Sequence, residues 1–221
     1  MKTRILLSWS SGKDSAWALH ALQQDPDWEI AGLLTTFNES VDRVAMHAVR
    51  RTLVEAQAAA AGLPLIRIPI PSPCPNEVYE ARMGEAVRQA RLAGITHMAF
   101  GDLFLEDVRR YREDKLAGTG IEPVFPIWGI PTNVLAREMI AGGLVAQITC
   151  VDPRQIAPGF AGRTWNADLI SELPESADPC GERGEFHTFC YAGPMFRQPI
   201  AVTAGEVLER DGFVFADCLP V

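Results

Sequence analysis

Residues 6–19 read LLSWSSGKDSAWAL, and this stretch decides how the rest of the chain is interpreted. An apolar run ends at Leu7, a turn of small polar residues follows, and a helical pattern of alanine and leucine begins at Ser15. Hydroxyls, one glycine and one lysine between a strand and a helix are typical of phosphate binding, because free backbone N–H groups and the helix dipole attract an anion there. The stretch therefore predicts a phosphate-binding turn at the start of an α/β fold.

The turn fits neither of the two common phosphate motifs. A Walker A loop, G-x-x-x-x-G-K-[ST], needs a glycine and a final Ser or Thr at positions where this chain has Leu7 and Asp14. The dinucleotide motif G-x-G-x-x-G needs three glycines, and this turn holds only Gly12. What remains is the string S-S-G-K-D-S at residues 10–15.

Each residue type in this string suits the chemistry of a bound phosphate. Gly12 lets the backbone turn and come close to a ligand, the serines donate hydrogen bonds, and Lys13 supplies a positive charge. Asp14 would repel a phosphate unless a cation lay between them, so it predicts Mg²⁺. A helix cap at Ser11 or Asp14 is the plainer alternative, but it explains one residue and leaves the whole turn unexplained.

Composition narrows the class of protein. With 221 residues, 48% apolar and 22% charged, the chain is globular and long enough for one α/β domain with a small appendage. Its net charge of −8 argues against nucleic acid as the main partner but allows a small anionic ligand. There is no run near the roughly 20 apolar residues of a membrane span, no signal-peptide pattern, and no CxxC pair among five cysteines. We therefore expect a cytoplasmic protein that does not bind membranes.

Strand and helix patterns alternate along the first two-thirds of the chain. The expected strands are residues 4–9, 29–37, 65–70, 96–101, 123–128 and 144–151, and the expected helices are 15–24, 44–61, 76–93, 107–116 and 132–141. This alternation predicts an α/β fold with a parallel sheet covered by helices on both faces. Ligands of such sheets lie beyond the carboxyl ends of the strands, which singles out loops 8–15, 36–46, 71–76, 101–106 and 126–131.

The amino-acid composition changes after residue 151. Residues 152–185 are rich in Pro, Gly and Asp with one short helix near 166–173, and 186–221 resemble antiparallel strands. We therefore expect an α/β nucleotide-binding domain over 1–151 and a small, mostly β appendage over 152–221 that folds back on it, since so short a segment buries little core alone.

A second polar motif, CGERGEFHTFC, stands at residues 180–190. It places Glu182, Glu185 and His187 around a glycine turn. Taken alone, it predicts a solvated turn that leads into a strand. Cys180, His187 and Cys190 do not have the spacing or the number of ligands of a standard zinc site.

Together the two motifs carry a family resemblance. S-S-G-K-D-S resembles the S-G-G-x-D-S loop of the PP-loop ATP pyrophosphatases, with Ser11 where that family more often has glycine. Within that superfamily, GERGEFHTF resembles the G-E-x-G-E-F-H-T motif of the diphthine–ammonia ligase family. Residues 43–65 and 123–129 are similar to that family as well, so the resemblance spans nearly the whole chain.

The resemblance implies a Rossmann-like (HUP-type) parallel sheet and an ATP-dependent ligase that requires Mg²⁺. ATP adenylylates a carboxylate, pyrophosphate leaves, and ammonia then displaces AMP to give an amide. The residues implied to bind the nucleotide are Ser8, Ser10, Ser11, Gly12, Lys13, Asp14, Ser15, Thr35, Thr36, Phe37, His47, Gly101 and Asp102. Among them Asp14 is implied to hold Mg²⁺ and residues 35–37 to contact adenine through their backbone. The residues implied to be catalytic are Asp14, Glu182, Glu185 and His187, the last three on the acceptor side.

Several alternatives stay open at the level of sequence. His47 is as well explained as an exposed histidine at a helix start, and Asp102 as a turn cap. The carboxylate substrate is a small molecule or a protein side chain, and the chain is a monomer or a homodimer. A sensor that binds ATP or AMP without chemistry would have little use for the second motif. A thiolating PP-loop enzyme would need a reactive cysteine pair or a basic surface.

Overall fold

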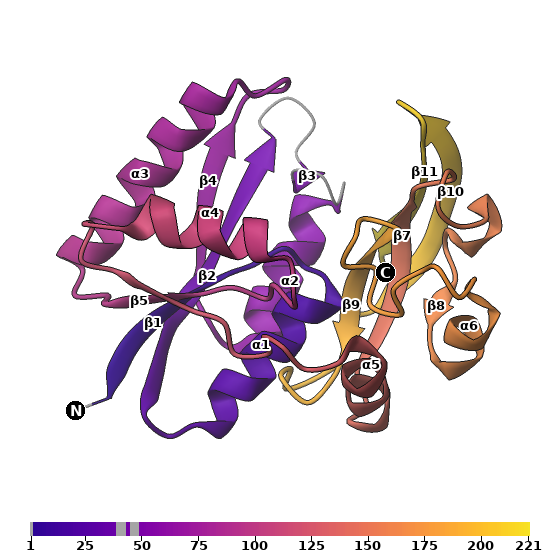
Figure 1. Cartoon of the computed structure of the whole chain (residues 1–221), viewed down its shortest axis with the longest axis horizontal. Helices are drawn as coiled ribbons and strands as arrows, with labels where there is room; N and C mark the ends of the chain where they lie inside the picture. The colour runs from indigo at the N-terminus through magenta and orange to yellow at the C-terminus, as the bar shows by residue number, and fades with distance from the viewer. Residues whose placement is uncertain (1, 39–42, 45–48) are drawn as a thin grey trace.

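The computed structural model describes residues 2–38, 43–44 and 49–221, and it contains two sheets that lie side by side (Figure 1). The first sheet is built from five parallel strands in the spatial order β4-β2-β1-β5-β6. These are β1 (Thr3–Ser8), β2 (Trp28–Asn38), β4 (Leu65–Ile70), β5 (His97–Ala99) and β6 (Glu122–Val124). A two-residue strand, β3 (Arg43–Val44), pairs antiparallel with the end of β2.

Helices cover both faces of this sheet, as the alternation of side chains along β1 requires. The helices of the chain are α1 (Lys13–Gln24), α2 (Arg51–Ala61), α3 (Asn76–Leu92), α4 (Glu106–Leu116), α5 (Thr132–Ala141) and α6 (Ala167–Glu172), with a 3₁₀ turn at Pro158–Phe160. Ile5 and Leu7 pack with α1 and α2, whereas Leu6 packs with α3 on the opposite face. Burial on both faces explains the unbroken apolar run that opens the chain.

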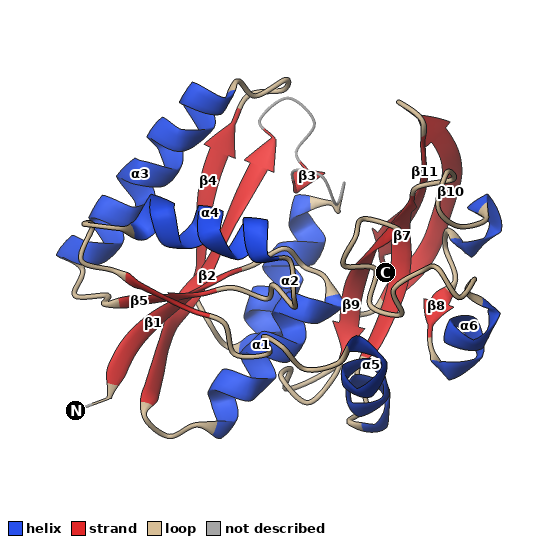
Figure 2. Ribbon diagram, viewed as in Figure 1, coloured by secondary structure: helices blue, strands red, loops and turns tan. Residues whose placement is uncertain are grey.

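The second sheet is antiparallel and forms the right-hand lobe of Figure 2. Its strands are β7 (Val145–Val151), β8 (Thr164–Trp165), β9 (Phe186–Ala192), β10 (Val202–Arg210) and β11 (Phe213–Pro220). Strands β10, β11, β7 and β8 follow one another in space, and β9 pairs with β7. The prediction of an α/β fold with C-terminal antiparallel strands is thus confirmed.

Three expectations about individual elements were wrong. The strand expected over 123–128 ends at Val124, and a turn follows it. Residues 144–151 do not form the last parallel strand, because β7 pairs antiparallel with β8, β9 and β11. A run buried on both faces has the same pattern in either kind of sheet, so periodicity does not reveal its partners. The helix expected over 44–61 begins at Arg51, while Val44 belongs to β3. The division into domains at residue 151 stays a prediction.

The order of the strands places the ligand crevice. From β1 the chain winds through β2 to β4 on one side, then returns to β5 and β6 on the other. Adjacent β1 and β5 therefore form the topological switch point, where α/β sheets bind their ligands beyond the strand ends. Residues 10–15 follow β1, and Gly101 and Asp102 follow β5, so both segments lie at this point.

No helix in the described part of the chain is long and apolar enough to span a membrane.

Gly101 lets β5 approach the start of α1 backbone to backbone. A Cβ at this position would lie 2.8 Å from the Ser15 nitrogen and 2.9 Å from the Asp14 carbonyl carbon. Because backbone atoms, unlike the tip of a flexible side chain, do not move aside cheaply, only glycine fits here.

We expect Gly101→Ala to lower the free energy of unfolding by about 1–3 kcal/mol, the usual cost of overpacking. The matched control is Gly84→Ala within α3, where a Cβ would meet nothing within 4 Å. That control should raise stability by about 0.5–1 kcal/mol, because alanine favours a helix interior. Urea unfolding of the three proteins measures both effects, and equal stability of Gly101→Ala and wild type would contradict the packing argument.

Candidate active site

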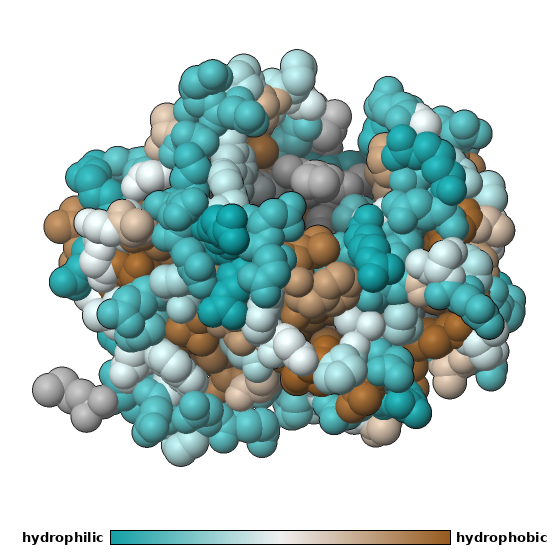
Figure 3. Space-filling view, viewed as in Figure 1, coloured by the Kyte–Doolittle hydropathy of each residue, from teal (hydrophilic) through white to brown (hydrophobic). Residues whose placement is uncertain are grey.

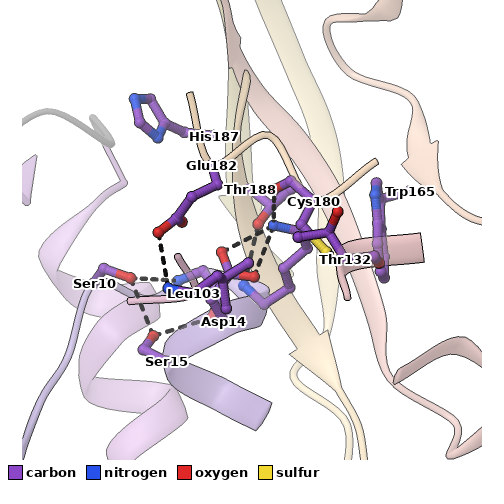
Figure 4. Close-up of polar contacts among 12 residues, drawn as sticks. Ser10, Asp14, Ser15, Leu103, Thr132, Trp165, Cys180, Glu182, His187 and Thr188 are labelled. Atoms are coloured by element: carbon purple, nitrogen blue, oxygen red, sulfur yellow. Dashed lines mark hydrogen bonds and ion pairs between the residues drawn. The ribbon is translucent and has the colours of Figure 1, made fainter. Parts of the chain in front are cut away.

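The turn between β1 and α1 is held by hydrogen bonds among its own small residues (Figure 4). The Ser10 and Ser15 hydroxyl oxygens lie 3.1 Å apart, and the Ser15 hydroxyl also donates to the Gly12 carbonyl at 3.0 Å. The Gly12 N–H donates to the Ser10 hydroxyl oxygen at 3.4 Å. These contacts gather two hydroxyls at the start of α1, where the helix dipole favours an anion.

Ser11 adopts a left-handed backbone conformation, with φ of 72°. This is the position where the sequence departs from the S-G-G-x-D-S pattern, and the backbone shows why glycine suits it. The Ser11 carbonyl accepts hydrogen bonds from the Cys190 N–H and the Gln57 amide, both at 2.9 Å. Its buried hydroxyl has no hydrogen-bond partner among the described residues, so the turn retains a donor for a ligand such as a phosphate.

Gln57 ties the turn to both sheets and was not predicted from the sequence. Its side chain is completely buried and accepts a hydrogen bond from the Trp9 indole N–H at 2.9 Å. Its amide group donates to the Ser11 carbonyl at 2.9 Å and to the Cys190 carbonyl at 2.6 Å. The available signal was a polar residue within the otherwise apolar stripe of α2, on the same face as Leu53.

Lys13 lies beneath the turn with only 2% of its surface exposed. Its ammonium group donates to both Asp14 carboxylate oxygens at 2.9 Å and to the Cys180 carbonyl. It also lies 5.5 Å from the ring centroids of Trp165 and Phe186. The ammonium is therefore enclosed by the second sheet and its loops, and in this conformation it neutralises Asp14.

The charge of Lys13 is maintained by its neighbours. Burial lowers the pKa of Lys13, but the negative charges around it, chiefly the Asp14 carboxylate and also Glu182, hold its pKa above the ordinary value. The Lys13 N–H, at the first turn of α1, donates to the Thr188 hydroxyl of β9 at 3.1 Å. Thr188 is thus a second residue of the site that sequence reasoning missed, although it belongs to the quoted motif.

Glu182 reaches the same cluster from the loop before β9. Its carboxylate accepts a hydrogen bond from the Leu103 N–H at 2.8 Å, as Figure 4 shows. Burial, together with the negative charges of Asp14 and Asp102, raises the pKa of Glu182 to about 7 despite this hydrogen bond and the charge of Lys13. Glu182 is therefore poised to gain or lose a proton near neutral pH.

Glu185 has a different environment from Glu182. It is 1% exposed, and its two carboxylate oxygens accept hydrogen bonds from the Asp178 N–H at 2.8 Å and the Arg183 N–H at 2.9 Å. A carboxylate that is enclosed in this way holds the shape of its loop. We propose that Glu185 positions Glu182, in place of the catalytic role that the resemblance implied.

His187 lies on β9 with its ring directed away from Asp14 (Figure 4). Burial and the positive charge of Lys13 lower the pKa of His187 to about 4. The imidazole is consequently neutral at physiological pH, and its low pKa makes it a weak base there.

The remaining predicted residues lie around the same switch point. Ser8 ends β1 and pairs with Leu34, so Thr35, Thr36 and Phe37 extend past the end of β1 toward the crevice. The Thr35 hydroxyl donates to the Trp9 carbonyl at 2.8 Å. His47 lies outside the described residues.

Asp102 faces Arg112 of α4 at 3.4 Å. Burial raises the pKa of Asp102, and the Arg112 charge partly offsets this effect. The negative charge of Asp102 also contributes to the raised pKa of Glu182. Its nucleotide-binding role stays a prediction.

The acidic groups fit a magnesium ion that arrives with phosphates and do not fit a metal cage made by protein alone. Within the described ranges, no group of three or more His, Cys, Asp or Glu side chains is arranged to hold a metal ion. Mg²⁺ commonly binds through one or two carboxylates together with substrate phosphates. Asp14, beside the hydroxyls of Ser10 and Ser15, offers one such carboxylate.

Four of the five thiols of the chain are unsuited to nucleophilic chemistry. Cys150, Cys180, Cys190 and Cys218 are buried. Burial raises the pKa of Cys150 and Cys218 to about 11, and it raises the pKa of Cys180 and Cys190 further. A thiol protonated to this extent is a poor nucleophile.

Comparison with known proteins gives matches over both halves of the chain. A sequence model of the diphthamide synthase N-terminal domain matches residues 1–119, and one of the C-terminal domain matches residues 131–215. The diphthine–ammonia ligases of Homo sapiens and Rattus norvegicus are each 30% identical to this chain over 118 residues, and that of Danio rerio is 29% identical. These alignments cover 51% of this chain but only 44%, 44% and 46% of the three relatives. The resemblance predicted from the two motifs is confirmed.

The left-handed conformation of Ser11 leads to a test of stability. We expect Ser11→Gly to raise the free energy of unfolding by about 0.5–1 kcal/mol, since glycine removes a strain of about 1–2 kcal/mol but loses more chain entropy. Ser11→Ala is the control, because it removes the unpartnered hydroxyl yet keeps the Cβ. If urea unfolding shows Ser11→Gly to be less stable than Ser11→Ala, the strain at this position is not real.

The low pKa of His187 leads to a test of pH dependence. The unfolded chain takes up a proton on His187 as the pH falls through about 6.5, whereas the folded chain takes it up only near pH 4. The stability that depends on neutral His187 is therefore fully present above pH 6.5 and is lost as the pH falls toward 4. His187→Gln should make the free energy of unfolding less dependent on pH in this window, by up to about 1.4 kcal/mol per pH unit. A His187 imidazole that titrates near pH 6.5 by NMR would refute the assignment.

Proposed function

The chain belongs to the diphthamide synthase family, and from this premise we propose that it is an ATP-dependent ligase that joins ammonia to a substrate carboxylate. The observation that best supports this proposal is that the two sequence motifs lie together at the switch point. Glu182 of the second motif and the Lys13–Asp14 pair of the first form one cluster there. Because the alignments cover less than half of each curated relative, the activity of those relatives is a proposal for this chain.

In this proposal the turn holds the phosphates of ATP. The hydroxyls of Ser10, Ser11 and Ser15 and the backbone N–H groups at the start of α1 are the donors. Asp14 would hold Mg²⁺, which would neutralise charge on the phosphates and on departing pyrophosphate. Residues 35–37, which extend beyond β1, would contact adenine through their backbone.

The reaction consists of two displacements. A carboxylate oxygen of the acceptor attacks the α-phosphorus of ATP, a P–O bond forms, and pyrophosphate leaves with the electrons of the broken P–O bond. Ammonia then attacks the acyl carbon, a C–N bond forms, and AMP leaves with the electrons of the C–O bond. The nitrogen loses one proton in forming the amide, and ionised Glu182 is the group that would accept it, since the pKa of about 4 makes neutral His187 the weaker base.

The ionisation of Glu182 suits a role toward ammonium as well. With a pKa of about 7, this carboxylate is partly ionised at neutral pH and would attract the cation. A thiolating function is less well supported, because the four buried thiols have raised pKa values. A sensor without chemistry differs from the ligase in one measurable respect: it binds ATP but does not turn it over, so substitution of Glu182 leaves its properties unchanged.

We expect Asp14→Asn to abolish Mg²⁺-dependent ATP binding, and Glu182→Gln to preserve ATP binding but to lower turnover by about 10²–10⁴-fold, the usual contribution of a general acid or base. Turnover is measured as release of labelled AMP from α-labelled ATP with Mg²⁺, ammonium chloride and a mixture of small-molecule and peptide carboxylates from cells. The control is Glu172→Gln, which changes an exposed carboxylate paired with Arg163 and should alter neither property.

The labelled product distinguishes the hypotheses. AMP that appears only when the carboxylates are present is the expected result. Labelled ADP in place of AMP would overturn the adenylylation mechanism. ATP binding without turnover in the wild type, unchanged in Glu182→Gln, would favour the sensor.

A further inference from the structure

A polar cleft of about 240 Å³ opens where the first lobe meets β10 and β11. Three arginines line it, Arg43 and Arg50 from the first lobe and Arg210 from β10, together with the acidic residues Glu206 and Asp217. The lining itself carries three positive and two negative charges, and a further carboxylate, Asp211, lies 3.7 Å from Arg210; the net charge of the chain is −8. No feature of the proposed ATP site uses these residues.

Arg43 and Arg50 both donate hydrogen bonds to the Asp217 carboxylate. Arg43 donates to the two oxygens of Asp217 at 2.9 and 3.1 Å, which is the paired geometry that guanidinium and carboxylate favour. Arg50 donates from its Nε to the same carboxylate at 3.2 and 3.3 Å, and from its Nη2 as well. Burial raises the pKa of Asp217, but these hydrogen bonds lower it to about 2, so the group is a carboxylate at all physiological pH values.

Of the three arginines, Arg210 has the longest ion-pair distance. Its side chain is 55% exposed, and its Nε lies 3.7 Å from the Asp211 carboxylate, which is itself exposed. Its guanidinium carbon lies over the Phe215 ring, 4.8 Å from the ring centroid. A guanidinium placed on an aromatic ring is oriented for binding at low entropic cost.

The register of the second sheet relates this cleft to His187. Phe215 of β11 pairs with Cys150 of β7, and Cys150 pairs with His187 of β9. Residues paired in this way share one face of an antiparallel sheet, so Phe215 and His187 lie on the same face about 10 Å apart, two strand spacings. Asp217, two residues beyond Phe215, shares that face too, and Thr149 joins the cleft to the strand by donating to the His187 carbonyl at 3.4 Å.

From these observations we propose that the cleft binds a second carboxylate of the acceptor, so that the substrate is a small dicarboxylic acid. This inference rests on the proposed function. One carboxylate reaches the ATP site near His187 and Glu182, and the other lies among Arg43, Arg50 and Arg210. The volume is below the roughly 300 Å³ at which cofactor-sized pockets begin, which fits one charged end of a small molecule.

An ion pair that merely ties the two lobes together is the plainer account of Arg43 and Arg50. It does not require the second guanidinium on Asp217, and it does not involve Arg210, which contacts Asp211 and the Phe215 ring. The third guanidinium and the open volume are explained when an anion from outside enters the cleft, and the sheet register brings the cleft within two strands of His187.

The test measures binding of probe acids directly. A series of α,ω-dicarboxylates with four to eight carbons is titrated into the full chain, each against the monocarboxylate of equal length, with isothermal calorimetry or ligand-observed NMR as the readout. We expect dicarboxylates to bind more tightly than monocarboxylates, with an optimum at one chain length.

Three variants locate that preference. Arg50→Gln should weaken dicarboxylate binding about tenfold, because a charge-assisted hydrogen bond is lost. Arg210→Gln should weaken dicarboxylate binding about threefold. Because this variant leaves the Arg43–Asp217–Arg50 contact intact, weaker binding would not result from a weaker contact between the two lobes. Asp217→Asn should strengthen it, because the competing internal carboxylate loses its charge. Arg163→Gln, which changes an exposed arginine paired with Glu172, is the control and should have no effect.

The outcomes separate this inference from the proposed function. Mg²⁺-ATP affinity and the unfolding midpoint should be unchanged in Arg210→Gln. The dicarboxylate site is overturned if mono- and dicarboxylates bind equally, or if the preference for dicarboxylates is the same in Arg50→Gln and Arg210→Gln as in the wild type. Either result counts against the site even if the chain makes AMP. Arginine-dependent dicarboxylate binding without AMP formation supports the site and overturns the ligase.

Discussion

The contact between the turn at residues 10–13 and strand β9 is the constraint on which the rest of the site depends. The Cys190 N–H donates to the Ser11 carbonyl, and the Lys13 N–H donates to the Thr188 hydroxyl. A Cβ on Gly12 would lie 3.2 Å from the Thr188 carbonyl oxygen, so the two backbones touch with no side chain between them. The first motif and the second, more than 170 residues later, are therefore one structural unit, and any displacement of the second sheet would move the turn with it.

This contact also determines the electrostatics of the site. It encloses Lys13 beside Asp14, and burial of a charged pair is costly unless its hydrogen bonds are satisfied, as they are here by Cys180. The same enclosure affects Glu182 and His187 in opposite directions, because burial favours the neutral form of each group. The pKa of Glu182 rises to about 7 and that of His187 falls to about 4. Near neutral pH, Glu182 is therefore the better base of the two.

Local chemistry was readable from the sequence, whereas long-range partnership was not. The residues of S-S-G-K-D-S predicted a phosphate turn without reference to any other part of the chain, and alternating strands and helices predicted the parallel sheet. By contrast, nothing near Gln57 reveals that it bridges Trp9, Ser11 and Cys190. Glu182 and Glu185 look equivalent in the motif, yet one faces the cluster and the other is enclosed by backbone N–H groups. The partners of β7 were missed for the same reason, since pairing depends on residues distant in sequence.

The two-lobed arrangement restricts how an acceptor reaches the site. Figure 3 shows apolar residues at the centre of one face, between α4 and the second sheet, with polar residues around them. The arginine-lined cleft lies where β3 and the start of α2 meet β10 and β11. On a chain with a net charge of −8, three arginines gathered in one cleft give an acidic substrate a favoured approach. Arg43 and Arg50 belong to the lobe that carries the turn, and Arg210 belongs to the lobe that carries Glu182 and His187. An anion bound among all three would contact both lobes at once, and its binding energy would then hold together the two motifs that the reaction requires.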